Sequence, residues 1–292
     1  MKLRDRPYLL LTLAVLFWSG NFILGRAFHT AIPPVALAFW RWLGAALIVS
    51  CPALPYMRRD YRLLLNHWKV ILALSILGIA AFNTLVYTGL QYTGAINAFL
   101  IQSLMPVIIV LMSFVIFGER VTRLQGLGIL VSLSGAVLII TRGEVEVLRS
   151  LSFNHGDLLV IAAVVCYAGY SVLLGRRPRV HPLAFIAITF WLGTLILLPL
   201  YLWETLTVAV LEIRPSNLLV IGYVMVFPSI VSYLCFNRGV ELVGANRAGL
   251  FIHLMPVFGS LMAVFFLGEV FSWFHGLGIL LIGAGIYLAT IR

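Results

Sequence analysis

Long apolar runs follow one another along the chain and are separated by short polar connections. A helix that crosses a membrane needs about 20 predominantly apolar residues. Ten segments meet this requirement, and little sequence remains between them for a soluble domain. The predicted spans are 8–27, 33–55, 69–90, 95–117, 122–141, 157–175, 181–203, 217–237, 245–267 and 272–291. The pattern predicts an all-α membrane protein with ten transmembrane helices, the first retained and not cleaved as a signal peptide.

An internal repeat relates the two halves of the chain. Shifted by 150 positions, residues 87–142 align with 237–292 without a gap, and 21 of 56 aligned positions are identical. The stretch GLQYTGAINAFLIQSLMPV faces GVELVGANRAGLFIHLMPV, and FGERVTRLQGLGIL faces LGEVFSWFHGLGIL. We predict two five-helix repeats, residues 1–150 and 151–292. Because five is odd, the second repeat runs inverted, a plan common in secondary transporters with the substrate site near the midplane.

Composition and charge agree with a lipid environment. The chain is 62% hydrophobic and 10% charged, whereas a soluble domain carries about 25% charged residues. The net charge of +10 lies in short connections, which is typical of membrane topology and not of nucleic-acid binding. With a cytoplasmic N-terminus, fifteen Lys and Arg residues face the cytoplasm, four face the other side, and Arg41 lies within a span. We expect both termini in the cytoplasm and no nucleic-acid partner.

Several motifs resemble those of a known transporter family. They are Trp18-Ser19-Gly20-Asn21, Pro33-Pro34 followed by Phe39-x-Arg41, Met105-Pro106, and Gly118-Glu119-x-x-Thr122-x-x-Gln125-Gly126, which recurs from Gly268 with His275 in place of Gln125. The whole chain resembles the EamA branch of the drug/metabolite transporter superfamily. Within that branch it is most similar to YddG-type exporters of aromatic and other neutral amino acids. The resemblance implies a bacterial inner membrane.

Catalytic and metal-binding patterns are missing from the sequence. There is no HExxH, P-loop or GxSxG motif, and we predict that none of the ten carboxylates lies near the middle of a helix. The three cysteines have no CxxC spacing and are interpreted as small buried hydrophobes. We therefore expect no cofactor, no metal and no enzyme activity. An intramembrane enzyme and a channel stay open as other classes, although a channel needs neither inverted repeats nor central prolines.

Polar and aromatic side chains at membrane depth are the candidates for a substrate cavity. Polar groups there usually face the bundle interior or a cavity. Each one alone is equally interpretable as a contact between helices, but as a set on repeat-related helices they indicate an aromatic, weakly polar cavity. The predicted cavity residues are Asn21, Trp40, Asn83, Tyr87, Gln102, Ser103, Tyr167, Tyr170, Ser171, Trp191, Tyr233, Asn237 and His253.

Three further residues have two interpretations each. Pro106 and Pro256 remove a helix hydrogen bond in mid-membrane, which produces either a plain kink or a hinge for gating. Arg41 could bind a substrate carboxylate, or it could cap helix-end carbonyls or extend toward the membrane surface. Thr122 and Gln125 have capping-box spacing and predict the start of a helix.

The predicted cavity chemistry favours a neutral or zwitterionic substrate. A phosphorylated substrate would require several basic residues in the cavity, and a cationic drug exchanged for protons would favour a membrane carboxylate. We therefore predict an exporter of small neutral amino acids that works by alternating access, with the lipid bilayer as its environment and a monomer sufficient for transport. Flat cationic toxicants are the alternative, because aromatic walls can hold cations. Only His253 could titrate near neutral pH, which favours facilitated or weakly coupled transport.

Overall fold

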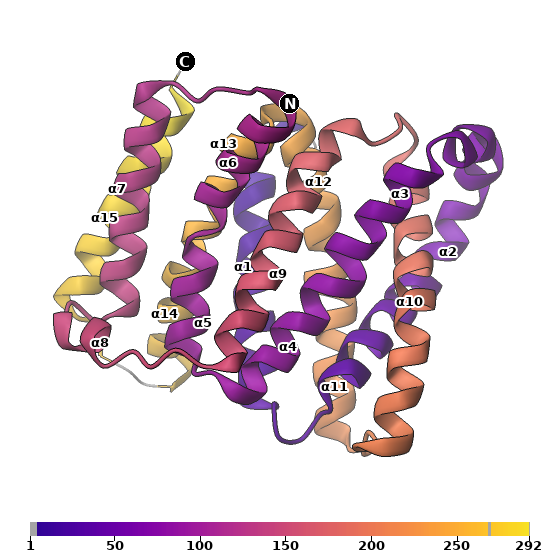
Figure 1. Cartoon of the computed structure of the whole chain (residues 1–292), viewed down its shortest axis with the longest axis horizontal. Coiled ribbons are helices and arrows are strands. Elements are labelled where there is room, and N and C mark those ends of the chain that lie inside the picture. Colours follow the sequence, from indigo (N-terminus) through magenta and orange to yellow (C-terminus); the bar gives the residue numbers. More distant parts are fainter. Residues whose placement is uncertain (1–4, 268–269, 292) are drawn as a thin grey trace.

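A single helical bundle makes up the computed structural model, which describes residues 5–267 and 270–291 (Figure 1). All regular secondary structure in these residues is helical. The first half contains α1 (Pro7–Ala27), α2 (Pro34–Asn66), α3 (Trp68–Leu74), the π-helical segment η2 (Ser75–Ala81), α4 (Phe82–Tyr92), α5 (Ala95–Ser103), α6 (Met105–Phe117), α7 (Arg123–Ile140) and the short α8 (Val145–Arg149). The second half contains α9 (His155–Leu173), η3 (Leu174–Arg176), α10 (Pro182–Thr207), α11 (Pro215–Val224), the π-helical segment η4 (Met225–Val231), α12 (Ser232–Val243), α13 (Ala245–Leu250), η5 (Phe251–His253), α14 (Leu254–Leu267) and α15 (Trp273–Thr290).

Nine helical stretches of the described chain are long and apolar enough to cross a membrane. They correspond to nine of the ten predicted spans. The remaining predicted span, 245–267, contains α13, η5 and α14 in direct succession. The prediction that the second span ends at residue 55 differs from the structure, because α2 continues to Asn66. Residues 58–66 are mostly arginine and leucine, which have high helix propensity, so the helix extends beyond its apolar part.

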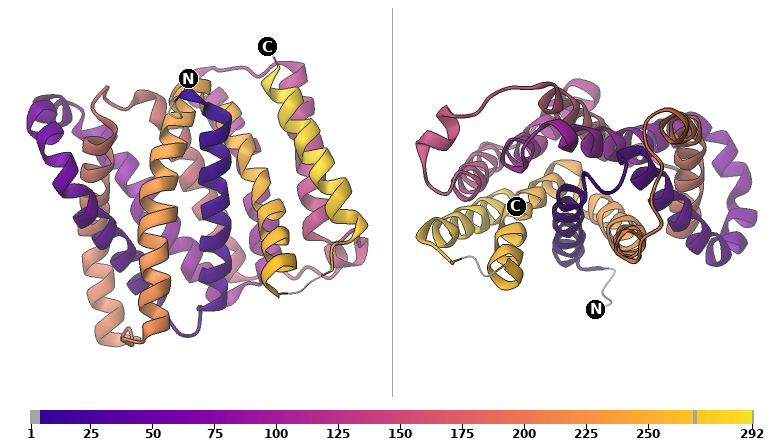
Figure 2. Two further views of the ribbon diagram at one scale, coloured as in Figure 1. Left: turned by 180° about the vertical axis from the view of Figure 1, so that it is seen from behind. Right: turned by 90° about the horizontal axis from the view of Figure 1, so that it is seen from below.

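Repeat-equivalent helices pack against each other at the two lateral edges of the bundle. Helix α7 lies beside α15 at one edge, and α2 lies beside α10 at the other, as both views show (Figures 1 and 2). Between them, α4 packs against α9 and α1 packs against α12. Helix α1 begins and α15 ends on the same side of the bundle (Figure 1). We call this side the near end and the opposite side the far end.

Four glycines form the contact between α7 and α15. A Cβ added at Gly128 would lie 2.5 Å from the Gly285 carbonyl oxygen, and one added at Gly135 would lie 2.7 Å from the Gly278 oxygen. The shift of 150 positions converts Gly128 into Gly278 and Gly135 into Gly285. The two contacts are therefore one contact repeated with the halves exchanged. Small residues allow backbones to approach this closely in a membrane, where packing drives helix association.

The two π-helical segments are also separated by 150 positions. They span Ser75–Ala81 and Met225–Val231, so each residue of one has an equivalent in the other. A π-helical turn shifts the backbone hydrogen-bond register and leaves carbonyl groups available to other donors. Here the Gly78 carbonyl accepts a hydrogen bond from the Tyr233 hydroxyl. The equivalent Pro228 carbonyl accepts one from the indole Nε1 of Trp18 at 3.0 Å.

The Gly-Glu motif forms a tight connection between α6 and α7. Gly118 has φ +69°, in the left-handed region that favours glycine, and ends α6. Thr122 and Gln125 form the predicted capping box at the start of α7. In the second copy His275 takes the role of Gln125, because its Nδ1 accepts the Ser272 backbone N–H at 2.9 Å. Gly268 lies outside the described residues.

Candidate functional site

Arg41 lies at the centre of a buried polar cluster. It lies on α2 at membrane depth, and only 1% of its surface is exposed. Its Nη1 atom lies 2.8 Å from Asn83 Oδ1 and 2.7 Å from the Tyr87 hydroxyl. The same Nη1 lies 3.1 Å from Asn21 Oδ1, and Nε donates to Ser229 Oγ at 2.6 Å. Every one of these acceptors is neutral, so hydrogen bonds and not a counter-ion hold the guanidinium in place.

Aromatic rings form the other side of the site. The Trp18 ring packs edge-on against Tyr167 and Tyr233, with centroid distances of 5.5 and 6.1 Å. The rings of Phe82 and Phe236 complete the cluster around Tyr167 at 4.6 and 5.7 Å. Edge-to-face and tilted arrangements at these distances are the favoured geometries of aromatic pairs. The aromatic rings therefore form a well-packed wall.

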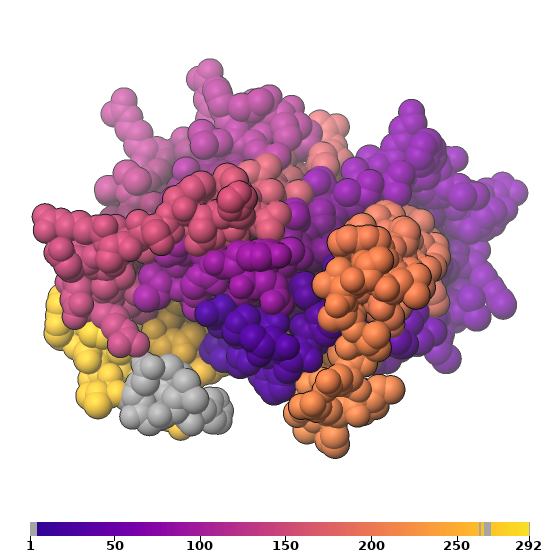
Figure 3. Space-filling view, turned by 60° about the horizontal axis from the view of Figure 1, so that its bottom comes forward, coloured from indigo at the N-terminus to yellow at the C-terminus, as the bar shows by residue number. Residues whose placement is uncertain are grey.

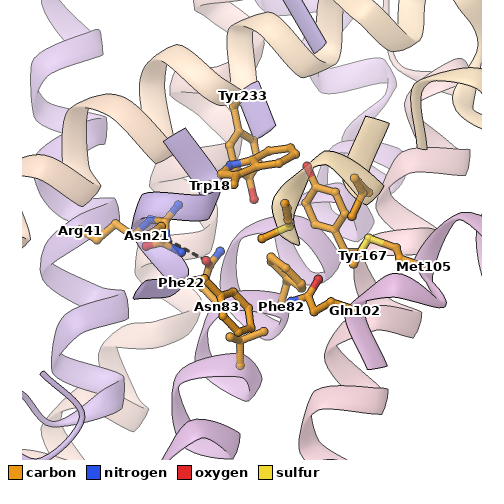
Figure 4. A pocket seen from close by; sticks show the side chains of 13 residues that line it. Trp18, Asn21, Phe22, Arg41, Phe82, Asn83, Gln102, Met105, Tyr167 and Tyr233 are labelled. Carbon is orange, nitrogen blue, oxygen red and sulfur yellow. Dashed lines mark hydrogen bonds between the residues drawn. The ribbon is translucent and has the colours of Figure 1, made fainter. Parts of the chain in front are cut away.

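A small cavity separates the Arg41 cluster from the aromatic wall (Figure 4). Its volume is about 20 Å³, which is room for about one water molecule. The sticks in Figure 4 show Arg41, Asn21 and Asn83 together on one side, with Tyr167 and Gln102 on the other. The cavity is lined by Trp18, Asn21, Phe22, Arg41, Phe82, Asn83, Val86, Gln102, Met105, Tyr167, Tyr233, Ile252 and Met255. A solute larger than water requires this cavity to widen.

Both halves of the chain contribute equivalent positions to the cavity. Three pairs of lining residues are related by the shift of 150 positions, and these are Asn83 with Tyr233, Gln102 with Ile252, and Met105 with Met255. The chemistry of each half nevertheless differs. Asn83 supports Arg41, whereas Tyr233 belongs to the aromatic wall. The cavity thus combines a repeated framework with one cationic side and one aromatic side.

Hydrogen bonds join the connections at the far end. Arg26 Nη1 donates to the Leu90 carbonyl at 2.9 Å, and Gln91 Nε2 donates to the His29 carbonyl at 2.6 Å. Figure 3 shows the indigo connection between α1 and α2 lying against the magenta segments at the middle of this face.

Two buried carboxylates add further ties at the far end. The Glu204 carboxylate, 3% exposed at the end of α10, accepts the backbone N–H groups of Val35 and Ala36 at 3.0 and 2.7 Å. Asp157 accepts the Thr93 hydroxyl at 2.5 Å. A carboxylate at a helix N-terminus satisfies orphan N–H groups and is favoured by the helix dipole. The far end is therefore tied together across α1, α2, α4, α9 and α10.

At the near end a large cleft opens between the helices. Its volume is about 960 Å³, and its lining includes Arg177, Arg179, Arg238 and Glu241. The Glu241 carboxylate pairs with Arg177 at 2.7 Å and with Arg238 at 3.0 Å. Partial burial, together with the Arg59 guanidinium, lowers the pKa of His181, which also lines the cleft. Arg177, Arg179 and Arg238 supply positive charge to the cleft.

An aromatic barrier lies between the near-end cleft and the central cavity. A small void of about 10 Å³ shares Arg177 and Arg238 with the cleft and reaches Asn237. Asn237 Oδ1 accepts the Tyr170 hydroxyl at 2.8 Å. The Tyr170 ring packs against Tyr167 and Tyr233 of the aromatic wall, with centroid distances of 5.3 and 5.7 Å. In this conformation the cleft and the cavity are separate.

Comparison with known proteins assigns this fold to a family. The EamA-like transporter family matches the chain twice, over residues 6–141 and 154–291. The chain belongs to the EamA-like transporter family. It is therefore an integral membrane transporter. As an EamA-like transporter it is similar over its full length to other members of the group.

Curated relatives and a solved structure extend this likeness. The uncharacterized transporter YyaM of Bacillus subtilis is 30% identical over 97% of this chain and 93% of its own. An uncharacterized transporter of Archaeoglobus fulgidus is 26% identical over 99% of both chains. A crystal structure with 21% identity superposes with a TM-score of 0.79 over 97% of this chain and 96% of its own, which shows a shared fold.

Six of the predicted site residues line the central cavity of this EamA-like transporter, and a seventh contacts it through Arg41. The lining residues are Asn21, Arg41, Asn83, Gln102, Tyr167 and Tyr233. Tyr87 donates to Asn21 Oδ1 at 2.5 Å and accepts from Arg41. Arg41 neither caps carbonyls nor extends to the surface, because all its hydrogen bonds among the described residues go to side chains.

The other predicted residues make contacts elsewhere. Trp40 is 37% exposed and its Nε1 donates to Tyr201, while Trp191 donates to Ser50. Ser171 bonds the Tyr167 carbonyl within α9. The remaining four are buried away from the cavity. Tyr170 bonds Asn237, and His253 contacts the Ser103 carbonyl at 2.8 Å and the Ser132 hydroxyl at 2.7 Å.

Both prolines follow a break in their helices. Pro106 lies in the first turn of α6, after α5 ends at Ser103. Pro256 lies in the first turn of α14, after the 3-10 segment η5. Because proline lacks a backbone N–H, it is well tolerated in the first turn of a helix. Each proline thus marks the start of a second helical piece within its span.

Sequence reasoning did not include Trp18 or Ser229 among the site residues. Trp18 lies three residues before Asn21 on α1, and residues at this spacing share a helix face, so its role could have been found. Ser229 follows Pro228, whose repeat equivalent is Gly78. A Gly or Pro interruption at corresponding positions of two apolar segments points to a binding site in transporters. The signal was therefore present in both cases.

Proposed function

We propose that this EamA-like transporter exports small neutral amino acids with aromatic or other apolar side chains, by alternating access through the central cavity. The observation that carries this proposal is the cavity itself, where the Arg41 guanidinium faces an aromatic wall containing Trp18, Tyr167 and Tyr233. Arginine is well suited to hold a carboxylate through two hydrogen bonds. Aromatic rings favour an apolar side chain at the other end of the same molecule.

Alternating access is proposed on the basis of the repeated framework. The chain is taken as ten transmembrane helices in two inverted repeats, residues 1–150 and 151–292. The double family match, the π-helical segments at equal offset and the repeated glycine contact support this division. In such a plan, exchange of the conformations of the two halves converts an inward-open form into an outward-open form. One chain encloses the cavity, so a monomer is sufficient.

The structure is best interpreted as a closed-cavity form that opens toward the cytoplasm. Ties across the far end and the 960 Å³ cleft at the near end support this interpretation. The near end is assigned to the cytoplasm of a bacterial inner membrane, because it carries the basic ends of α2 and α12. Substrate then enters from the cytoplasm through the cleft. Movement of Tyr170 and Tyr233 admits it to the cavity.

Pro106 and Pro256 are proposed as hinges for this movement. Each lies one residue after Met105 or Met255, and both methionines line the cavity. A break at this place lets the two pieces of a span tilt separately. Movement of α5 or α13 would therefore change the cavity while α6 and α14 keep their packing.

Facilitated transport is the proposed energetic mode. His253 is the buried histidine at membrane depth, and both of its ring nitrogens already have partners in Ser103 and Ser132. It does not line the cavity. A proton-coupling residue normally lies in the transport pathway. Uphill transport driven by a pH gradient and abolished by His253→Gln would contradict this mode.

Counterflow in liposomes tests the proposed function. Purified protein is reconstituted, the vesicles are loaded with unlabelled phenylalanine, and uptake of labelled phenylalanine is followed with and without a pH gradient. Saturable counterflow that is absent from protein-free vesicles is the expected result. Counterflow of a flat aromatic cation without any amino acid flux would reject the amino acid proposal and retain a carrier. Flux without saturation or counterflow would indicate a channel.

A further inference from the structure

The unpartnered polar atoms around the cavity are mainly hydrogen-bond donors. Asn83 Nδ2 and Gln102 Nε2 are buried and have no hydrogen-bond partner. The bonds of Arg41 use Nε and Nη1, so among the described residues Nη2 also has no acceptor. A buried donor without a partner costs about 1–3 kcal/mol. A ligand that supplies acceptors in the widened cavity would recover this free energy.

No carboxylate of the described chain neutralises Arg41. The buried carboxylates Glu204 and Asp157 have partners other than Arg41. Glu204 accepts the backbone N–H groups at the N-terminus of α2, and Asp157 accepts hydrogen bonds from Thr93 and Asn97. The described part of the cavity therefore has a charge of +1. Burying a charge without a counter-ion is unfavourable in the membrane interior, and such residues are commonly functional.

The acceptors that an ammonium group would meet in the described part of the cavity are neutral. Asn21 Oδ1 and Asn83 Oδ1 already accept from Arg41, and the unpartnered Tyr167 hydroxyl carries no charge. A zwitterion would place its ammonium group near the guanidinium without an opposing carboxylate from the protein. A singly charged carboxylate without an ammonium group would avoid this repulsion and still fill the donors.

We propose that the cavity recognises its substrate by the carboxylate group, so that monocarboxylates with an apolar or aromatic body are substrates and an α-ammonium group is dispensable. This inference rests on the proposed carrier function and extends its substrate class to carboxylates without an α-ammonium group. The carboxylate binds Arg41 and the free amide N–H groups of Asn83 and Gln102, whereas the apolar body lies against Trp18 and Tyr167.

Three molecules that share a 2-phenylethyl group test the inference. Counterflow is measured for phenylalanine, 3-phenylpropanoate and 2-phenylethylamine at pH 8, where both carboxyl groups are ionised, and protein-free vesicles correct for passive leak. We expect 3-phenylpropanoate to exchange at least as fast as phenylalanine. We expect 2-phenylethylamine to be slower by at least about tenfold, or 1.4 kcal/mol.

The outcomes separate this inference from the proposed function. Phenylalanine counterflow without 3-phenylpropanoate counterflow overturns the inference and leaves the amino acid carrier standing. Counterflow of 2-phenylethylamine alone overturns the inference and also rejects amino acid export. If none of the three exchanges, the proposed function fails and the inference fails with it.

A near-isosteric variant tests the charge argument directly. Asn83→Asp places a carboxylate 2.8 Å from Arg41 Nη1, at the position of the present amide oxygen. This carboxylate supplies the missing counter-ion and replaces the Asn83 amide donor, so we expect counterflow of 3-phenylpropanoate to fall at least about tenfold, with thermal stability equal to or above that of the wild type. Asn66→Asp, at the exposed end of α2, the helix that carries Arg41, is the matched control and retains full counterflow. Unchanged counterflow in folded Asn83→Asp protein would overturn the inference.

Discussion

The contact between α7 and α15 makes a sharp prediction about two glycines on one helix. At Gly128 an added Cβ would lie 2.5 Å from the Gly285 carbonyl oxygen and 2.8 Å from the Ala289 nitrogen. At Gly126, one half-turn away, an added Cβ would meet nothing within 4 Å. Gly128→Ala should therefore destabilise the protein, whereas Gly126→Ala should not, although the two substitutions are chemically the same.

The magnitude follows from the distances. Ordinary van der Waals contact for a Cβ begins at 3.4 Å, so the helices must separate by about 0.9 Å at Gly128. A gap of that size removes a quarter to a half of the dispersion attraction of the contacts affected, and overpacking typically costs about 1–3 kcal/mol. Alanine gains helix propensity at both positions, up to about 1 kcal/mol, so this gain cancels in the comparison. We expect the free energies of unfolding of the two variants to differ by about 1–3 kcal/mol.

Unfolding of the purified protein by sodium dodecyl sulfate in mixed micelles measures this difference, and counterflow assays report on function. The second copy offers an independent pair. Gly285→Ala would place a Cβ 2.5 Å from the Gly128 oxygen and from the Ser132 nitrogen, whereas Gly283→Ala meets nothing. The reasoning is refuted if Gly128→Ala and Gly285→Ala unfold at the same detergent concentration as their control variants, because the helices would then not be in close contact.

Three other predictions concern charge, titration and orientation. Glu204→Gln removes the carboxylate from the start of α2 and should lower the free energy of unfolding by about 1–3 kcal/mol. Glu212→Gln, in an exposed ion pair, should change stability little. Thermal unfolding compares the two variants, and equal losses would contradict the capping role of Glu204. His253→Gln should lower stability and leave the pH profile of counterflow unchanged, since the imidazole does not line the cavity; a shifted profile would place it in the pathway. In a cysteine-free background, Ile213→Cys in intact cells should react with an impermeant maleimide and Arg59→Cys should not; the reverse would invert the proposed orientation.

The comparison of sequence and structure is most instructive at the cavity. Asn21, Asn83 and Tyr233 were identified because polar or hydroxyl side chains at membrane depth seek the interior, and they do line the cavity. The same rule also selected Ser171 and His253, which have hydrogen-bond partners within the protein. Ser171 donates to the Tyr167 carbonyl, and His253 contacts the Ser103 carbonyl and the Ser132 hydroxyl. Polarity at depth indicates that a partner is needed and leaves open whether that partner is the protein or a substrate.

The tryptophan at the cavity is not one of the two that were predicted. The indole Nε1 of Trp40 on α2 donates to Tyr201, and that of Trp191 on α10 donates to Ser50. Trp18 was not included among the site residues, although its indole bonds a carbonyl of the π-helical segment η4. Because the Pro228 carbonyl lies in a segment 210 residues away along the chain, the periodicity of α1 does not predict this hydrogen bond.

The sequence by itself determined what is periodic or repeated over many residues. Apolar runs of spanning length predicted the helical membrane fold, and the gapless repeat located equivalent positions such as Met105 and Met255, which meet at the cavity. The surroundings of Arg41 were decided only by tertiary structure. Its acceptors come from α1, α4 and η4, up to 188 residues away along the chain, and no local pattern encodes whether those side chains are neutral or acidic. A charge left without a counter-ion is a property of three-dimensional packing, and that property gives this cavity its chemistry.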